Sequence, residues 1–349
     1  MVTRNDVARL ANVSPAVVSY VINNSNYVSQ EKKEAVLKAI DELGYYPNTL
    51  ARSLKSGKSQ QILLLTDDIR SEIFSEIHFY TEHVATEHGY SLAVSTYSAG
   101  NALSMLSSLH SHQYAGAFLF SALIPLSGEY LSRLNKIADD GMPITLFMFA
   151  KTDSDISPNI IRILPDIRQS VCHAVDYLFD KKKHRFIAYL GDGDPKATLE
   201  EGNGDGLRVN GYQDSLRKHG IEPEKKYIFF LDALQYDCRK YLNVEGVIKA
   251  YFEMEENERP TAFYVNSDIM AAELIKSFSR QGIQVPDDME IIGFGDTTSA
   301  TIVTPELTTV GLPSRVIGEA ALNALLGKIA GQEVPDQYFH LELIKRGSA

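Results

Sequence analysis

Apolar positions recur with helical spacing in three short stretches of residues 3–44. In the first stretch, Thr3 is placed to cap the amino end of a helix, and Asp6 supports that positive end from the first turn. The buried side is supplied by Val7, Ala8 and Leu10, and the period then breaks over residues 11–13. The pattern therefore predicts a short first helix that begins after Thr3.

A second short helix is predicted from Pro15 to about Asn23. Ser14 caps it, and Pro15 stands at the first helical position, where a missing N–H costs nothing. The residues with apolar side chains to bury are Val18, Val21 and Ile22. Two short helices and a tight turn predict a helix-turn-helix whose second helix suits the major groove of DNA. A three-helix bundle without a partner fits the same spacing.

A third helix is predicted between a cap at Ser29 and an end at Gly44. Pro47 then opens a segment, residues 48–55, that is too short to be stable as a free helix in water. This segment needs a partner chain or a DNA surface to order it.

From Gln60 onward, continuous apolar runs alternate with helical stretches. The runs form two successive series, 62–65, 117–120 and 144–149, then 186–190, 262–265 and 291–294. Such runs are typical of parallel strands buried on both faces. The predicted body is α/β, with two doubly wound lobes and a ligand site at the carboxyl ends of the strands, facing the cleft between the lobes.

The net charge of −11 argues against a nucleic acid partner until its distribution is considered. Residues 1–58 hold eight basic and five acidic residues, a balance of +3, so the remainder carries −14. A weakly basic head on an acidic body leaves the head to bind DNA. Because the head has few positive charges, tight binding is expected to need two heads.

Composition places the chain among soluble globular proteins, with 44% apolar and 23% charged residues in 349. The amino terminus has no signal-peptide pattern and no apolar run reaches membrane-spanning length, so we expect a cytoplasmic protein without a membrane partner. Cys172 and Cys238 are far apart and are predicted to be reduced core thiols.

Three motifs within the first sixty residues resemble the head and hinge helix of the LacI/GalR family of bacterial repressors. They are DVARLANVSPAVVSYVIN, YVSQEKKEAVLKAIDELGYYPN and ARSLKSG, at residues 6–23, 27–48 and 51–57. Further matches follow at 208–212, 266–271, 291–296, 307–310 and 344–348. The resemblance implies a homodimeric repressor of a pseudo-palindromic double-stranded DNA operator, controlled by a small-molecule effector, with a carbohydrate favoured by family prevalence. Control by a co-repressor or by a partner protein stays open.

The resemblance also implies a domain layout. Residues 1–46 form the helix-turn-helix domain, 47–59 the hinge helix and linker, 60–340 a periplasmic-binding-protein-like core, and 341–349 a tail. The expected lobes are interleaved: about 60–160 and 292–320 in the first, 161–291 and 321–340 in the second.

The candidate DNA contacts are of three kinds. The base-reading positions of the family fall on Pro15, Ala16, Tyr20 and Asn26, although Tyr20 also suits packing on a neighbouring helix and Asn26 a turn. Short polar side chains suited to phosphate contacts are Thr3, Ser14, Ser19, Asn23 and Ser29. In the hinge, Leu54 matches the leucine that wedges into the minor groove, flanked by Arg52 and Lys55; a dimer-contact leucine is the alternative.

The candidate effector contacts, implied by the same resemblance, are Ile73, Phe74, Arg208, Ser267, Asp268 and Asp296. Arg208 is favoured because a guanidinium anchors carboxylates, phosphates or sugar hydroxyls. Asp268 equally suits a helix cap. Phe149, Leu164 and Gly295 stand where family members often place a carboxylate, which weakens a simple sugar-hydroxyl pocket.

Other chemistry finds no support in the residues. The Gly- and Asp-rich stretch 191–206 lacks the spacing of an EF-hand, a Walker loop or a dinucleotide fingerprint, and the nine histidines show no HExxH. We therefore expect no cofactor, no metal and no catalytic residue. A transported-solute receptor would lack the basic head, and an enzyme would need an acid–base or metal constellation.

Overall fold

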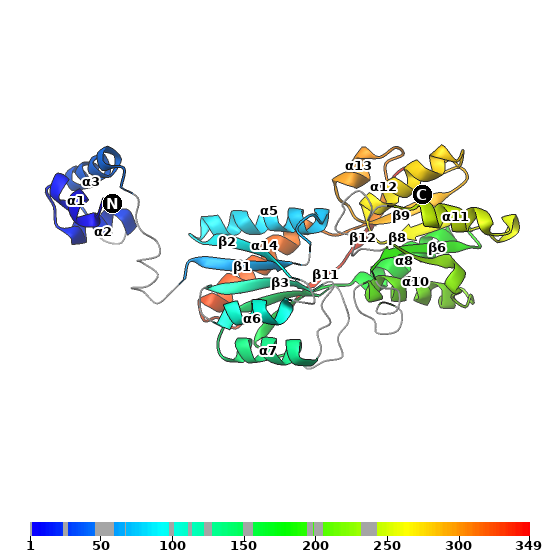
Figure 1. Cartoon of the computed structure of the whole chain (residues 1–349), viewed down its shortest axis with the longest axis horizontal. Coiled ribbons are helices and arrows are strands. Elements are labelled where there is room, and N and C mark those ends of the chain that lie inside the picture. Colours follow the sequence, from blue (N-terminus) through cyan, green and yellow to red (C-terminus); the bar gives the residue numbers. More distant parts are fainter. Residues whose placement is uncertain are drawn as a thin grey trace. The chain divides into compact units, whose positions relative to one another are not determined.

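The computed structural model of the chain describes residues 2–23, 27–45, 59–66, 68–97, 101–110, 114–121, 128–148, 156–193, 198, 205–231 and 243–349. The chain divides into two compact units, residues 1–59 and 60–349. Figure 1 shows the helical first unit and the two sheets of the second.

The first unit is a three-helix head formed by α1 (Arg4–Leu10), α2 (Pro15–Asn23) and α3 (Gln30–Leu43). Thr3 and Asp6 form a capping box, in which the backbone N–H of Thr3 donates to the Asp6 carboxylate at 2.9 Å. Gly44 closes α3 in the left-handed conformation, at φ +57°. The apolar core beneath these helices contains Val7, Ala8, Val18, Val36, Ala39 and Tyr45. All three predicted helices are confirmed, but Leu10, which was placed on the buried side of the first helix, is exposed.

The first lobe of the second unit is built on a six-stranded parallel sheet of order β11-β5-β4-β3-β1-β2. Its strands are β1 (Gln61–Thr66), β2 (Ser91–Thr96), β3 (Gly116–Ser121), β4 (Ile144–Met148), β5 (Ile160–Pro165) and β11 (Gln337–Phe339). On one face lie α5 (Glu72–Glu87) and α14 (Ser314–Ile329), which pack against each other. The other face is covered by α6 (Ala102–His110) and α7 (Gly128–Asp139).

The second lobe has a six-stranded sheet of order β12-β10-β9-β8-β6-β7, in which β12 runs antiparallel to β10 and the other pairs are parallel. The strands are β6 (Ile187–Asp192), β7 (Ile228–Leu231), β8 (Ala262–Val265), β9 (Glu290–Gly295), β10 (Thr308–Gly311) and β12 (Glu342–Ile344). One face carries α8 (Ile167–Asp180) and α10 (Gly206–Lys218), and the other carries α11 (Glu245–Glu253), α12 (Asp268–Arg280) and α13 (Thr298–Ile302). The predicted doubly wound α/β architecture is confirmed.

The predicted division into lobes is wrong in its later segments. Strands β9 and β10 belong to the second sheet, although residues 292–320 were expected in the first lobe. Helix α14 and strand β11 belong to the first lobe, although residues 321–340 were expected in the second. The chain crosses between lobes at residues 166, 312–313 and 340–341. Each crossing lies just after the carboxyl end of a strand, β5, β10 or β11, because the whole strand pairs within one sheet before the chain leaves that lobe.

Residues 341–349 are also more than the expected tail. They include β12, which pairs with β10, and Ser348 is fully buried. The Ser348 hydroxyl donates to the Ile291 carbonyl oxygen at 2.6 Å and accepts from the Thr308 N–H at 2.8 Å. This segment therefore belongs to the core of the second lobe.

Candidate DNA-binding surface and effector site

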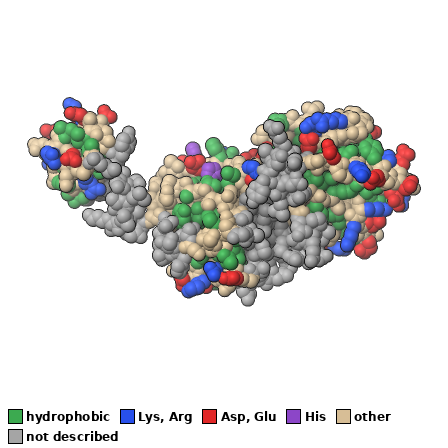
Figure 2. All heavy atoms as spheres, viewed as in Figure 1, with side chains coloured by type: hydrophobic (Ala, Val, Ile, Leu, Met, Phe, Trp, Pro, Cys, Tyr) green, Lys and Arg blue, Asp and Glu red, His purple; other side chains and the backbone are tan. Residues whose placement is uncertain are grey.

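The second helix of the head presents an exposed face opposite its buried one. Val18 is fully buried, whereas Pro15, Ala16 and Tyr20 are exposed, as a reading helix requires. Ser19 is half-buried. Figure 2 shows side chains of both charge signs on the face of the head in view, in keeping with its small positive balance.

Three of the predicted phosphate contacts are placed at helix starts. The Thr3 hydroxyl lies 2.6 Å from the Asp6 carboxylate within the capping box, so its first role is to fix α1. Ser14 precedes α2 and its oxygen accepts a long hydrogen bond of 3.4 Å from the Val17 N–H. Ser29 precedes α3 without a side-chain cap bond. Asn26, Arg52, Leu54 and Lys55 lie outside the described residues, so their roles stay predictions.

The carboxyl ends of the two sheets meet at the three crossings. Glu72 starts α5 after the end of β1, and its carboxylate accepts hydrogen bonds from Thr297 Oγ1 and Ser299 Oγ, each at 3.0 Å. Thr297 and Ser299 follow the end of β9, so this contact joins the first lobe to the second. Burial raises the pKa of Glu76 one turn further along α5, and the charge of Glu72 adds to that effect.

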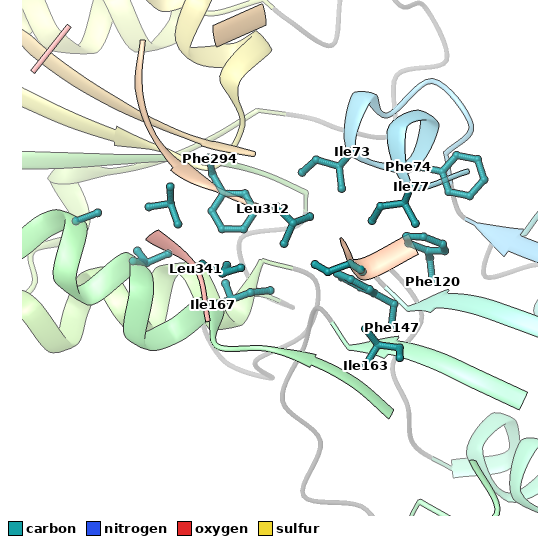
Figure 3. Close-up of a cluster of buried hydrophobic side chains, with 14 of the residues drawn as sticks. Ile73, Phe74, Ile77, Phe120, Phe147, Ile163, Ile167, Phe294, Leu312 and Leu341 are labelled. Atoms are coloured by element: carbon teal, nitrogen blue, oxygen red, sulfur yellow. The ribbon is translucent and has the colours of Figure 1, made fainter. Parts of the chain in front are cut away.

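The first lobe lines this region with apolar side chains. The Phe74 ring stands edge-on to Phe120 at 5.1 Å between centroids, and Phe120 stacks on Phe147 at 5.3 Å. Ile73 is buried beside them and also approaches the second lobe, where a Cβ on Gly295 would lie 3.3 Å from its Cδ1. Figure 3 shows these side chains in one cluster with Phe294, Leu312 and Leu341. A carboxylate side chain in place of Gly295 would therefore press against Ile73.

The second lobe holds a buried polar network centred on Asp205, which directly precedes α10. Arg208 Nη1 donates to Asp205 Oδ1 at 3.0 Å, and the Tyr189 hydroxyl donates to Asp205 Oδ2. Asn266 Nδ2, at the end of β8, also donates to Asp205 Oδ2 at 3.0 Å and to Asp192 Oδ1 at 2.5 Å. The Arg208 guanidinium lies over the Phe294 ring, 4.2 Å from its centroid.

The two oppositely charged side chains at the centre of this network are buried, and burial shifts the pKa of the acid. The side chains of Asp205 and Arg208 are only 2% and 11% exposed. Burial raises the pKa of the Asp205 carboxyl to about 6, although Arg208 beside it acts in the opposite direction. The carboxylate is therefore ionised at pH 7 and neutralises the guanidinium that it contacts.

In the network, the buried Tyr264 hydroxyl and Asn266 Oδ1 have no hydrogen-bond partner within the described part of the chain. Burial raises the pKa of Tyr264 well above its usual range, so the hydroxyl keeps its proton. The orientation of the Asn266 amide is fixed by chemistry, because only its NH₂ group can face two carboxylates. Asn266 Oδ1 is thus a buried hydrogen-bond acceptor to which no described group donates.

The other predicted effector residues have structural partners. Ser267 caps α12 and accepts from the Met270 N–H at 3.4 Å. Asp268 accepts from the Thr297 N–H at 2.8 Å and from Thr309 Oγ1 at 2.6 Å, and is 1% exposed. Asp296 pairs with Arg346. The contact of all six predicted residues, Arg208, Ile73 and Phe74 included, with an effector stays a prediction.

The predicted site omitted Tyr189, Asp205, Tyr264 and Asn266. A tyrosine inside a buried strand and an asparagine directly after one are the available signals, since buried polar groups need partners. The described residues contain no group of three or more His, Cys, Asp or Glu side chains placed to hold a metal ion. No helix in the described ranges is long and apolar enough to cross a membrane.

A helix-turn-helix head joined to a two-lobed body of parallel sheets defines a DNA-binding regulator of transcription whose body is built like a periplasmic binding protein. Residues 3–48 match the lacI family of bacterial regulatory proteins, and residues 175–349 match the periplasmic binding protein-like domain. The chain belongs to the lacI family.

Two relatives and one solved structure illustrate the similarity. Catabolite control protein A of Priestia megaterium is 33% identical over 337 residues, which cover 96% of this chain and 94% of that protein. The HTH-type transcriptional repressor CytR of Escherichia coli (strain K12) is 30% identical over 351 residues, 99% and 96% of the two chains. The Lac repressor dimer bound to operator shares the fold, with a TM-score of 0.79 and 24% identity over 99% of this chain and 98% of that one.

Proposed function

We propose that the protein is a cytoplasmic repressor, not an enzyme, that binds a pseudo-palindromic operator as a homodimer. Its affinity for the operator is set by a small molecule held between the lobes. The exposed face of α2 above a fully buried Val18 carries the DNA-binding half of the proposal. Two heads bring two such helices to successive half-sites, which compensates for the small charge of each head.

The effector half of the proposal is supported by the interlobe region. Three phenylalanines of the first lobe share an apolar cluster with Phe294, and the hydrogen-bonded Arg208–Asp205 pair lies against the ring of Phe294. Apolar side chains next to a few fixed polar groups are the composition expected of a small-molecule site. Because three chain segments cross here, a ligand that favours one relative position of the lobes acts on the whole body. Coupling between ligand and operator is then a free energy of about 1–3 kcal/mol.

Selection of operators from a random duplex library, followed by fluorescence anisotropy with each selected duplex, tests this function. We expect two inverted half-sites and a stoichiometry of two chains per duplex. The same titration with added sugars and nucleobases shows whether an effector weakens or strengthens binding. Full-length protein that remains monomeric and binds no duplex at low salt would contradict the proposal.

The hinge is tested separately by Leu54→Ala. If Leu54 wedges between base pairs, this variant binds the selected operator more weakly and bends it less in a circular-permutation gel assay. Equal affinity and equal bending would remove the wedge assignment and leave a dimer contact.

A further inference from the structure

The charge of Arg208 is already satisfied inside the protein. Its guanidinium is held between the Asp205 carboxylate, 3.0 Å away, and the face of Phe294. Asp205 is held in turn by Tyr189 and Asn266, so the pair has little freedom to separate. An anionic ligand at this arginine would have to displace a buried carboxylate that lies in the same unit of structure.

The network as a whole also disfavours anions. It contains two carboxylates, Asp192 and Asp205, and one guanidinium. A further carboxylate or phosphate beside them would lose its hydration and gain a repulsive neighbour. An ammonium group would have to be buried beside Arg208, at a similar cost of desolvation.

The buried polar atoms without hydrogen-bond partners indicate which groups a ligand would need. Asn266 Oδ1 needs a hydrogen-bond donor, and the Tyr264 hydroxyl donates or accepts. Both residues are buried at the carboxyl end of β8 and adjoin the Arg208–Asp205 pair. The guanidinium of that pair lies over Phe294, which shares an apolar cluster with Ile73 and Phe74 of the first lobe. A buried hydroxyl and a buried amide oxygen without partners are costly, and a ligand that hydrogen-bonds to both would remove that cost.

We propose that Asp205 acts as a built-in counter-ion for Arg208, so that the interlobe site selects an uncharged ligand whose hydroxyl or amide groups bond to Tyr264 and Asn266. This inference rests on the proposed effector site. It assigns Tyr264 and Asn266 the role of ligand contacts and Asp205 the role of a residue that excludes anions through Arg208.

The tyrosines offer a first test that needs no ligand. Tyr189 and Tyr264 stack at 5.9 Å in neighbouring strands, but only Tyr189 has a hydrogen-bond acceptor in the described structure. We expect Tyr264→Phe to melt at the same temperature as the full-length wild type or higher, and Tyr189→Phe to melt several degrees lower. A loss at Tyr264→Phe equal to that at Tyr189→Phe would show a structural partner for the Tyr264 hydroxyl and overturn its assignment.

Ligand charge is tested with glucose and gluconate as paired probes, at equal ionic strength, by thermal shift. In the wild type, glucose is expected to raise the melting temperature at least as much as gluconate. In Asp205→Ala, where the guanidinium has lost its counter-ion, gluconate is expected to raise it more than glucose. The matched control is Asp214→Ala, which is expected to keep the wild-type order. Asp214 lies on α10, which Asp205 precedes, and its partly exposed carboxylate pairs with Arg168 of α8.

Two results would overturn the inference: a larger gluconate shift in the wild type that Arg208→Met abolishes, or an unchanged order in Asp205→Ala. If Asp205→Ala does not fold, the comparison of wild type with Arg208→Met decides alone. Operator binding is measured on the same wild-type preparation, so that failure of the proposed function appears as loss of DNA binding, whatever the probes show.

Discussion

Asp205 is a buried acid on which three other polar side chains converge. Its folded-state pKa of about 6 lies above the ordinary value of 3.8, because burial outweighs the attraction of Arg208. The folded state therefore holds this proton more tightly than the unfolded chain does. The carboxyl favours folding fully below pH 3.8, and this contribution is lost as the pH rises through about 6.

We predict that Asp205→Asn flattens this part of the pH profile. The wild type should lose about 2 kcal/mol from this group between pH 4 and pH 7, and the variant should not. Urea unfolding of both proteins at steps of half a pH unit gives the difference between their free energies of unfolding. The contributions of the other acidic groups are common to both proteins and cancel in this difference. Parallel profiles for the two proteins would show that Asp205 does not titrate in this window.

Among single residues, the sequence reveals Arg208 but not what surrounds it. The arginine stands in a recognisable motif, whereas Asp205 belongs to a Gly- and Asp-rich stretch that is typical of a loop. Tyr189 and Tyr264 read as strand residues because an aromatic ring suits a buried sheet. Which of them has a partner depends on contacts between β6, β8 and α10, and no local pattern records those.

At the scale of elements, the helix pair α8 and α10 meets at a glycine. A Cβ on Gly211 would lie 2.3 Å from the Arg168 carbonyl oxygen and 2.9 Å from Val171 Cβ. Both obstacles are fixed parts of α8, so the two helices would have to separate.

Gly211→Ala is therefore predicted to lower the free energy of unfolding by about 2 kcal/mol. Gly246 is the matched control, since it also lies in a helix but a Cβ added there would meet no described atom within 4 Å. Gly246→Ala should leave stability unchanged or raise it by up to about 1 kcal/mol. Denaturant unfolding measures both, and equal effects at the two glycines would contradict the close-approach explanation.

Elements were easier to predict than their membership in a lobe. The apolar runs 262–265 and 291–294 mark β8 and β9 closely, because a strand buried on both faces has an unbroken apolar sequence. The sheet to which a strand belongs is set by non-local pairing. Nothing in the residues of β9 or α14 states that β9 pairs with β8 or that α14 packs on α5.

At the scale of the whole molecule, the hydrogen bonds of Glu72 join the two lobes: its carboxylate, in the first lobe, accepts from hydroxyls at the start of α13 in the second. We predict that Glu72→Ala lowers the free energy of unfolding by about 2 kcal/mol, because Ser299 loses its charged acceptor and Thr297 keeps only the carboxylate of Asp268. We also expect a broader distribution of lobe separations. Spin labels at His83 and Arg280, in a chain with both native cysteines replaced, measure that distribution by electron–electron resonance.

The control for Glu72 is Glu129→Ala, which removes an exposed pair with Arg133 within α7. Surface pairs of this kind contribute little, so this variant should resemble the wild type. An unchanged distance distribution in Glu72→Ala would show that apolar packing alone holds the lobes.

The charge of the whole molecule sets how DNA binding responds to salt. The body carries −14 and the head +3, so affinity must come from phosphate contacts of the two heads against a repulsive background. We predict a loss of about 1,000-fold in operator affinity between 50 and 200 mM salt. Anisotropy titrations at four salt concentrations measure the slope, and an affinity independent of salt would contradict this account.

The last two strands have a consequence for how the chain is made. The head uses consecutive residues, but each lobe lacks an edge strand until β11 and β12, at 337–339 and 342–344, leave the ribosome. The head can thus fold early in synthesis, while both lobes are completed only after residues 337–344 have been made. A nascent chain halted before residue 337 would expose β5 and β10 as open edges, each a template for aggregation.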